Sequence, residues 1–163
     1  MRLYGVTGWK NAGKTGLVER LVTEITGRGV AVSTIKHAHH DADIDQPGRD
    51  SYRHREAGAR EVLLSTPHRW ALLHELRDNP EPSLNDLLLH LSPVDLVLIE
   101  GYKFEPHSKI EAHRQVIGRP PLAGKIDTIR ALAADGPVDT DLPVFGLDDT
   151  AAIADFILRE VGL

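Results

Sequence analysis

The sequence predicts an α/β fold of three layers, built on a mainly parallel β-sheet with some additional β-strands. Three observations predict it. Strand-like and helix-like segments alternate along the chain, a near-continuous apolar strand lies at 95–100, and a glycine-containing loop joins the first strand to the first helix. A chain of 163 residues is one domain by the usual size range, so we expect a single domain over residues 1–163.

The N-terminal part of the chain predicts a β-α-β unit. A short β-prone segment at Leu3–Thr7 precedes a helix at Gly16–Thr26, where apolar residues recur at helical spacing and define one buried face. Gly27 and Gly29 end that helix. The second strand covers Val30–Lys36, and we expect the crossover between the two strands to be right-handed.

Capping residues and short apolar runs predict the remaining elements. The run at Asp95–Glu100 is typical of a strand that is covered on both faces. Ser83 and Asp86 form a capping-box pattern at the start of one helix, and Asp149 caps the last helix. The Pro-rich stretch Arg119–Gly124 is most simply a surface loop. Further elements are a helix at Asp50–Ala57 and strands at Glu61–Ser65, Arg69–Leu73, Ile129–Ala134 and Pro143–Phe145.

Composition excludes several classes of function. A net charge of −5 argues against a general binder of nucleic acid or acidic membranes, because such proteins normally carry a basic surplus. The absence of cysteine excludes disulfides and thiolate metal sites. The N-terminus carries no long apolar signal segment, and no run of about 18 apolar residues follows. We therefore expect a cytoplasmic protein with neither a nucleic-acid nor a membrane partner.

The segment Gly8–Thr15, GWKNAGKT, fits the phosphate-binding pattern G-x-x-x-x-G-K-[ST] and lies between a strand and an amphipathic helix, as the motif requires. It predicts a P-loop NTPase-like fold and a single P-loop nucleotide-binding domain. Glycine at 8 and 13 brings backbone N–H groups close to phosphate oxygens. We expect Lys14 to reach the β- and γ-phosphates and Thr15 to ligate Mg²⁺. The alternative is a glycine-rich turn with an incidental lysine. The predicted nucleotide-binding residues are Gly8, Lys10, Asn11, Ala12, Gly13, Lys14, Thr15 and Gly16.

A P-loop site also needs a carboxylate, because Mg²⁺ prefers oxygen ligands. Glu100 ends the apolar DLVLI strand, where α/β sheets place their ligand chemistry, and Gly101 leaves room beside it. Glu100 would bind the metal directly or through a water, or orient an attacking water. The alternative is a carboxylate that caps a neighbouring helix. We thus predict Lys14 and Glu100 as catalytic residues, and Thr15 and Glu100 as metal ligands.

The segment TIKHAHHDADIDQPGRDSYRHREAGA, residues 34–59, combines clustered histidines, alternating acids and a basic run. We interpret it as a switch-like loop on the exit from the second strand, with acids facing Mg²⁺ and its waters and bases facing phosphate or a second substrate. A zinc site held by histidine and carboxylate, and a solvated loop without function, stay as alternatives. The residues assigned to the switch-like loop are His37, His39, His40, Asp41, Asp50 and Arg53.

Four segments, GWKNAGKT, IKHAHHDADIDQPGRDSYRHREAGA, LVLIEGYK and LDDTAAIADFI, together resemble the MobB family of molybdopterin-guanine dinucleotide biosynthesis proteins. The resemblance covers most of the chain. It implies a GTP-binding, weakly hydrolysing homodimer that is an adapter for the molybdenum cofactor guanylyltransferase, with a direct contact to molybdopterin left open. It also implies that Glu100 stands at the Walker B position. Trp9 stands where the wider class carries a lysine, and Lys10 follows it.

Guanine preference rests on the resemblance alone. The sequence has no NKxD motif, and Gly124–Asp127, GKID, lacks the asparagine and follows a Pro-rich loop rather than a strand. Asp135, at the end of the IRALAA strand, is better placed to accept hydrogen bonds from the N–H edge of guanine. The alternative is that Asp135 is a turn residue before Gly136.

Two other functions stay open. The basic run Arg49–Arg55 would suit the acceptor of a P-loop small-molecule kinase. The histidine cluster would suit a nucleotide-driven metal-delivery GTPase.

Overall fold

The computed structural model describes residues 1–38 and 45–163, which form two compact units. The first unit combines residues 1–38 with 92–163, and the second falls within residues 39–91. The expectation of one domain over residues 1–163 stays a prediction, because compactness alone does not decide whether the smaller unit folds by itself.

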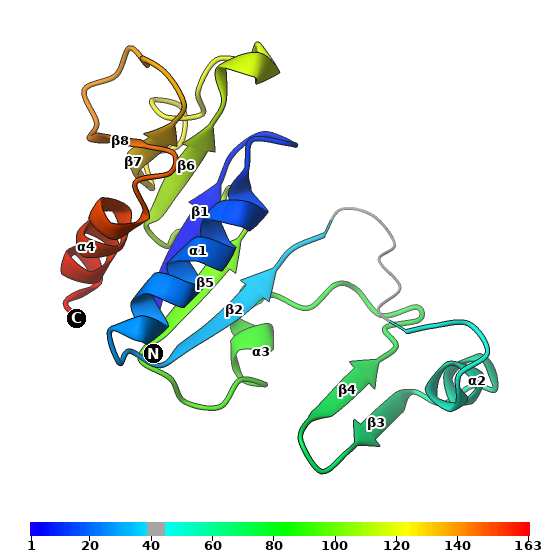
Figure 1. Ribbon diagram of the computed structural model, residues 1–163. Coiled ribbons are helices and arrows are strands. Elements are labelled where there is room, and N and C mark those ends of the chain that lie inside the picture. The colour runs from blue at the N-terminus through cyan, green and yellow to red at the C-terminus, as the bar shows by residue number, and fades with distance from the viewer. Residues whose placement is uncertain (39–44) are drawn as a thin grey trace. The chain divides into compact units, whose positions relative to one another are not determined.

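A six-stranded sheet forms the first unit, and each neighbouring pair of strands in it runs parallel. The strand order is β2-β5-β1-β6-β7-β8 (Figure 1). Because β5 lies between β1 and β2, the predicted β-α-β unit skips one strand. The strands are β1 Arg2–Thr7, β2 Val32–Lys36, β5 Leu96–Glu100, β6 Lys109–His113, β7 Ile129–Ala134 and β8 Val144–Gly146.

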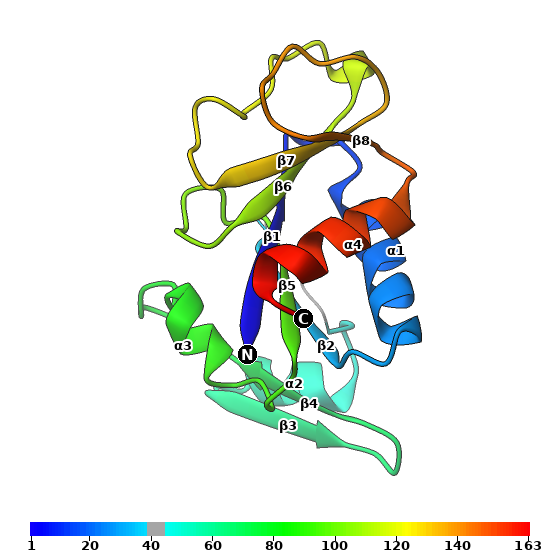
Figure 2. The same cartoon turned by 90° about the vertical axis from the view of Figure 1, so that its left-hand side faces the viewer.

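Helices α1 (Lys14–Gly27) and α4 (Thr150–Val161) lie side by side on one face of this sheet (Figure 2). Leu17, Leu21 and Ile25 of α1 are fully buried in one core with the sheet, as the helical spacing predicts. None of the helices in the described part of the chain is long and apolar enough to cross a membrane.

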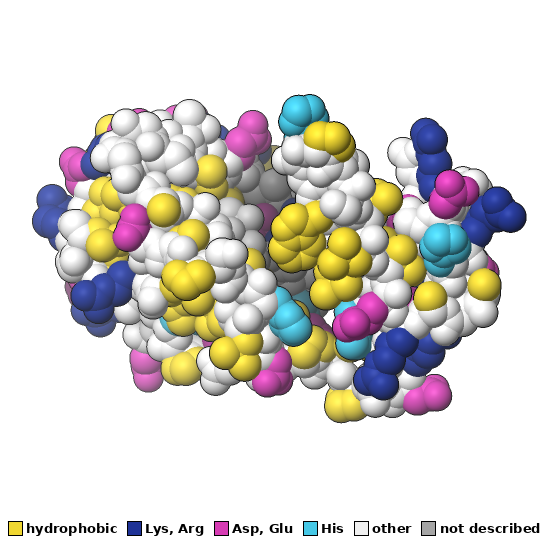
Figure 3. Space-filling model, turned by 90° about the horizontal axis from the view of Figure 1, so that it is seen from below, with side chains coloured by type: hydrophobic (Ala, Val, Ile, Leu, Met, Phe, Trp, Pro, Cys, Tyr) yellow, Lys and Arg dark blue, Asp and Glu magenta, His cyan; other side chains and the backbone are white. Residues whose placement is uncertain are grey.

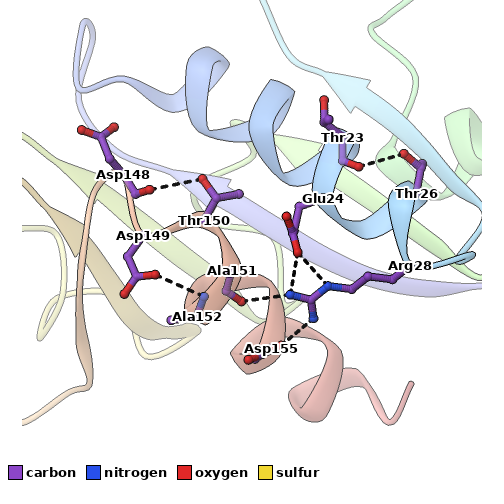
Figure 4. Close-up of polar contacts among 10 residues, drawn as sticks. All are labelled: Thr23, Glu24, Thr26, Arg28, Asp148, Asp149, Thr150, Ala151, Ala152 and Asp155. Atoms are coloured by element: carbon purple, nitrogen blue, oxygen red, sulfur yellow. Dashed lines mark hydrogen bonds and ion pairs between the residues drawn. The ribbon is translucent and has the colours of Figure 1, made fainter.

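Arg28, just after α1, joins the two helices (Figure 4). Its guanidinium donates to Glu24 one turn earlier in α1, and to the Asp155 carboxylate and the Ala151 carbonyl of α4. One side chain thus satisfies a helix carbonyl and two carboxylates, and it fixes α4 against α1 and hence against the sheet.

Both predicted helix caps are present. Ser83 Oγ accepts the Asp86 N–H at 3.2 Å, and the Asp86 carboxylate accepts the Ser83 N–H at 3.1 Å, which completes the capping box of α3 (Leu84–Leu88). Asp149 Oδ1 accepts the Ala152 N–H at 3.4 Å at the start of α4 (Figure 4). These local signals are readable from the sequence because cap and partner lie three residues apart.

The prediction contains no strand at residues 109–113, and it is wrong there: this segment is β6, between β1 and β7. Lys109 and Glu111 alternate with small apolar residues, a pattern typical of a half-solvated segment. In the structure all five residues of β6 are buried. The charged side chains point away from the core beneath α1 and α4, towards loops that supply their hydrogen bonds.

The Glu111 carboxylate anchors one of these loops. It accepts the N–H of Leu122 at 2.8 and 2.9 Å and that of Ala123 at 2.8 Å. The Arg119–Gly124 stretch is therefore more than a surface loop: Arg119 is exposed, but Leu122 is buried and its backbone is bound. Burial of Glu111 is tolerated because both carboxylate oxygens are hydrogen-bonded.

The Lys109 ammonium anchors a second loop. It donates to the Glu105 carbonyl at 2.6 Å, the His107 carbonyl at 2.8 Å and Thr128 Oγ1 at 2.8 Å, which engages all three of its N–H groups. Burial, opposed by Glu105, lowers the Lys109 pKa to about 8. The α/β fold with a mainly parallel sheet is confirmed.

The second unit holds the additional strands, an antiparallel hairpin in which Leu63 pairs with Leu72. Several of its hydrophobic side chains lie at the surface, and Figure 3 shows hydrophobic side chains gathered there. Arg55 bridges Asp45 at 3.3 Å and Glu75 at 2.7 Å within this unit. The elements are α2 Asp50–Glu56, β3 Glu61–Ser65, β4 Trp70–His74 and α3 Leu84–Leu88.

Candidate functional site: the P-loop edge of the sheet

The P-loop joins β1 to α1 at the carboxyl edge of the parallel sheet, where this fold class binds ligands. Its backbone requires glycine at two points. Gly8 has a φ of +142°, and a Cβ there would lie 2.4 Å from the Ala112 carbonyl oxygen. Gly13 has a φ of +93°, and Asn11 also adopts the left-handed region with a φ of +65°. The predicted tight turn is therefore present.

Lys14 lies over the loop from which it emerges. Its Nζ donates to the carbonyl oxygens of Gly8 at 3.1 Å and Trp9 at 2.8 Å. Burial is the main cause of its lowered pKa; the Glu100 carboxylate opposes the shift and two nearby lysines add to it. The ammonium thus sits at the mouth of the loop, bound to carbonyls that a phosphate oxygen would replace.

Thr15 and Glu100 meet at the same edge. Thr15 Oγ1 donates to Glu100 Oε1 at 2.8 Å, and Glu100, the last residue of β5, is only 7% exposed. A Cβ on Gly101 would lie 3.2 Å from the His37 Cβ, so glycine is needed beside the carboxylate. A hydroxyl and a carboxylate at this spacing fit Mg²⁺, which takes oxygen ligands and usually keeps several waters.

Lys36 is a site residue that the sequence prediction missed. It ends β2, and the register of β2 with β5 places it opposite Glu100. Its Nζ donates to Thr15 Oγ1 at 3.2 Å and lies 3.5 Å from Glu100 Oε1. The only signal in the sequence is its place at the end of a predicted strand, since the register that brings it to Glu100 is set by tertiary contacts.

A cavity of about 290 Å³ opens at the P-loop, lined by Asn11, Gly13, Lys14, Thr15 and Gly16. The structure thus brings together most of the predicted nucleotide-binding residues. Of the remaining ones near the loop, Ala12 is buried and Lys10 is exposed.

Trp9 is held from several sides. Its Nε1 donates to the Pro120 carbonyl at 2.9 Å, and two cations lie over the ring, the Lys103 ammonium 4.8 Å and the Arg119 guanidinium 4.7 Å from its centroid. Cations over an aromatic ring are favourable. The residue that replaces the lysine of the wider class therefore ties the P-loop to the 119–124 loop.

Arg114 is a second residue that the sequence prediction missed. It follows β6 directly, and a Cβ on Gly13 would lie 3.2 Å from its Nε. A guanidinium against the P-loop glycine adds positive charge where phosphates would bind. Recognising Arg114 required recognising β6 as a strand.

Asp135 follows β7 at the same edge as the P-loop, because all the strands are parallel. Its Oδ1 accepts the Gln115 N–H at 2.8 Å, which fixes the carboxylate beside the loop after β6. Gln115 Nε2 in turn donates to the Pro137 carbonyl at 2.8 Å. By contrast, Gly124–Asp127 lies before β7, at the amino end of that strand, which is the opposite edge of the sheet.

The described residues assigned to the switch-like loop belong to both units, and their common role stays a prediction. The His37 ring stacks on Tyr102 with centroids 4.6 Å apart. Asp50 and Arg53 lie on α2 in the second unit, where they approach each other to 3.9 Å. His39, His40 and Asp41 fall outside the described residues. Among the residues of 1–38 and 45–163, no three His, Asp or Glu side chains converge as a metal-binding group.

Comparison with known proteins identifies the family. Residues 3–135 match the profile described as "Molybdopterin guanine dinucleotide synthesis protein B", MobB. The "Molybdopterin-guanine dinucleotide biosynthesis adapter protein" of Escherichia coli K12 is 37% identical over 96% of this chain and 91% of its own length. The protein of the same name from Haemophilus influenzae is 39% identical over 95% and 86%.

Solved structures of MobB proteins have the same fold as this chain. A crystal structure of a MobB protein homolog from Bacillus stearothermophilus matches with a TM-score of 0.75 at 28% identity, covering 99% of both chains. Bacillus subtilis MobB, at 23% identity and a TM-score of 0.76, shares the fold. The glycine-containing loop between β1 and α1 lies where the sequence predicts it, within the predicted α/β fold, and the chain belongs to the MobB family.

Proposed function

We propose that this chain binds GTP with Mg²⁺ at the P-loop, hydrolyses it slowly, and is an adapter in the biosynthesis of molybdopterin guanine dinucleotide. The observation that carries the proposal is the assembled trio of Lys14, Thr15 and Glu100 at one edge of the sheet. Membership of the MobB family supports the biosynthetic role, and the E. coli and H. influenzae relatives are named adapter proteins.

Each residue has a defined task in this proposal. Backbone N–H groups of the P-loop and the first turn of α1 bind phosphate oxygens, and Lys14 neutralises the β- and γ-phosphates. Thr15 and Glu100 would hold the metal, Glu100 either directly or through a water. When bound, Mg²⁺ supplies neutralisation of the phosphate charge. Arg114, against Gly13, adds a further cation.

Asp135 is our candidate for guanine recognition. Its Oδ1 is held by the Gln115 N–H, so its Oδ2 is the atom that we assign to the N1–H and N2–H edge of guanine. A carboxylate accepts hydrogen bonds from that edge, whereas adenine offers no comparable pair of donors. The selectivity should therefore depend on the charge and the acceptor capacity of this one side chain.

Slow hydrolysis is the expected behaviour of this site. The Glu100 carboxylate is engaged by Thr15 and Lys36, and the sequence shows no evident glutamine or arginine finger. A partner protein can supply the group that orients the attacking water or stabilises the transferred phosphoryl group. Turnover should then increase when the partner is present.

Calorimetric titration with GTP and with ATP, each with and without Mg²⁺, tests the nucleotide assignment. We expect GTP to bind more tightly than ATP, and Asp135→Asn to lose this preference. Asp139→Asn, an exposed aspartate in the following loop, is the matched control and should keep it. Clear preference of the wild type for ATP, or no binding of either nucleotide, contradicts the proposal.

We also propose that the partners are the molybdenum cofactor guanylyltransferase and a second copy of this chain, in the cytoplasm. Exposed hydrophobic residues on the hairpin of the second unit support a homodimer, because a two-stranded sheet is marginal in water without further cover. Sedimentation velocity should show a dimer that dissociates in a Leu63→Asp, Leu72→Asp double variant. A monomeric wild type at micromolar concentration counts against this part.

Co-purification with a tagged copy tests the adapter role, with nucleotide and bound molybdopterin measured in the same sample. Retention of the guanylyltransferase, with GTP present, is the expected outcome. Phosphoryl transfer to a small acceptor faster than to water would favour the small-molecule kinase instead. Stoichiometric zinc or nickel that is lost when His37, His39 and His40 are replaced by alanine would favour metal delivery.

A further inference from the structure

Lys36 puts a protein cation on the two oxygens that the proposed metal would use. Its Nζ lies 3.2 Å from Thr15 Oγ1 and 3.5 Å from Glu100 Oε1, while these two oxygens lie 2.8 Å apart. The three groups come from α1, β2 and β5, so the contact is made by the packing of the sheet and not by sequence neighbours.

We propose that Lys36 is a built-in substitute for the divalent cation: in the nucleotide-free chain its ammonium holds Thr15 and Glu100 together and competes with the metal for them. This proposal deepens the proposed function, since it rests on the same metal site. In this proposal Lys36 is a positioning residue. It determines how strongly nucleotide binding at the site depends on the divalent cation.

Electrostatics explains why the site needs a resident cation. Glu100 is 7% exposed, and a buried carboxylate without a partner is strongly unfavourable. The Thr15 hydroxyl supplies one hydrogen bond but no charge, so Lys36 supplies the positive charge. Without it, only the more distant charge of Lys14 would offset the carboxylate when the phosphates of a nucleotide arrive.

The ammonium and a metal ion cannot use these oxygens together. The Thr15 hydroxyl donates its proton to Glu100 and accepts from Lys36, so the ammonium already engages one of the two lone pairs of this oxygen. A divalent ion at the same place would also lie within a few ångströms of the ammonium and be repelled by it. Metal binding therefore requires Lys36 to leave.

The side chain can leave without disturbing the fold. Pairing of Lys36 with Glu100 fixes the β2 backbone, and the His37 N–H donates to the Glu100 carbonyl at 3.0 Å just beyond. The Lys36 side chain itself is 56% exposed, so its ammonium has a route into water or towards the phosphates. Replacement of the Lys36 ammonium by a metal ion then changes only the side-chain torsions of Lys36.

The direct test measures Mn²⁺ binding to the nucleotide-free full chain by electron paramagnetic resonance, with Mn²⁺ as the probe for the divalent site. Lys36→Met should bind Mn²⁺ about fivefold more tightly than wild type, the fold-change of an exposed ion pair near the upper end of its usual strength. Lys36→Arg keeps the charge and should stay near wild type. Lys125→Met, an exposed lysine on the 119–128 loop, is the matched control and should be unchanged.

Equal or weaker Mn²⁺ affinity in Lys36→Met overturns the proposal, and so does the absence of any Mn²⁺ site in that variant. These titrations contain no nucleotide, so they judge Lys36 even if the wild type fails to bind GTP, a result that would remove the proposed function alone. The double variant Glu100→Gln, Lys36→Met should bind Mn²⁺ no more tightly than Glu100→Gln alone, because the effect of Lys36 must pass through the Glu100 carboxylate. A tighter Mn²⁺ affinity in the double variant would overturn the proposal as well.

A second measurement follows the coupling between metal and nucleotide. In EDTA, Lys36→Met should bind GTP about fivefold more weakly than wild type, because one cation fewer then offsets Glu100 beside the phosphates. With saturating Mg²⁺ the two proteins should bind GTP alike. A deficit of the same size with and without Mg²⁺ would show Lys36 to be an ordinary phosphate contact, which contradicts a substitute for the metal.

Discussion

Two regions of the same sheet each hold one lysine and one glutamate, and they differ in their partners. At the carboxyl edge, Lys14 donates to P-loop carbonyls and Glu100 accepts from the Thr15 hydroxyl. On the face opposite α1 and α4, Lys109 donates to two carbonyls and a hydroxyl, and Glu111 accepts two backbone N–H groups. We call the first pair the P-loop pair and the second the anchor pair.

Burial alone does not separate the two glutamates, because Glu100 and Glu111 are both buried; Lys109 is fully buried and Lys14 partly so, and burial is the main cause of the lowered pKa of both lysines. What separates the two pairs is whether a ligand can replace the partner. Lys14 and the hydroxyl-bearing Thr15 line the cavity at the P-loop, and Glu100 and Lys36 line a neighbouring cavity that Thr15 shares. The partners of the anchor pair belong to loops that the pair itself holds in place. The first arrangement is suited to binding, the second to stability.

The largest expected effect is on GTP binding, when the lysine of the P-loop pair is removed. Lys14→Ala should weaken GTP binding by about a thousandfold, because a charge-assisted contact to two phosphates is lost. The free energy of unfolding should change by no more than about 1 kcal/mol, since the freed Gly8 and Trp9 carbonyls can bind water. Calorimetry and urea unfolding of the same preparation measure both. Normal GTP binding would show that the site is assigned wrongly.

The next effect tests the anchor pair. Glu111→Ala should lower the free energy of unfolding by about 3 kcal/mol, because the buried N–H groups of Leu122 and Ala123 lose a charged acceptor. Urea unfolding measures it. An unchanged midpoint would mean that the loop finds other acceptors, and the contrast between the two glutamates would then fail.

Glu100→Gln tests the other member of the P-loop pair, and we expect a smaller effect than for Glu111→Ala. Mg²⁺-dependent hydrolysis should fall by about tenfold with little loss of GTP binding, because the amide is a poorer metal ligand than the carboxylate. Stability should stay within about 1 kcal/mol of wild type, as expected when a buried charge is replaced by a neutral group of the same shape. Equal hydrolysis rates in variant and wild type would exclude a role for this carboxylate.

The smallest effect is a pH dependence beside the anchor pair. Burial first, and Lys109 second, lower the pKa of His107 from 6.5 to about 4. Between these values the unfolded chain binds a proton that the folded chain does not, so stability falls as the pH drops from 6.5 towards 4 and is unaffected above 6.5. His107→Leu should lose less stability than wild type between pH 7 and pH 5 in urea unfolding.

His68→Leu, at an exposed histidine of the second unit, should follow the wild type over the same pH range. If His107→Leu lost more stability than the wild type as the pH falls, the lowered pKa of His107 would be contradicted. The test concerns the first unit alone, where the His107 ring lies against Gly5 of β1.

Much of the fold was predictable, and the misses have one cause. The ends of the elements agree with their predicted ranges to within about two residues, and both helix caps form as expected, because helical spacing and caps act over three or four residues. β6 was missed because charged residues occupy its buried face. The partners of Glu111, the Leu122 and Ala123 N–H groups, lie far enough along the chain that no local pattern reveals them.

The motif GWKNAGKT is readable without a structure, because its turns, lysine and hydroxyl lie within eight consecutive residues; that the loop binds phosphate stays a prediction. The sequence also determined the strand that ends in Glu100. Only the tertiary structure decided that Lys36 lies opposite Glu100 and that Arg114 lies against Gly13. Strand order and register arise from non-local packing of the sheet, and neither leaves a signal in a short stretch of sequence.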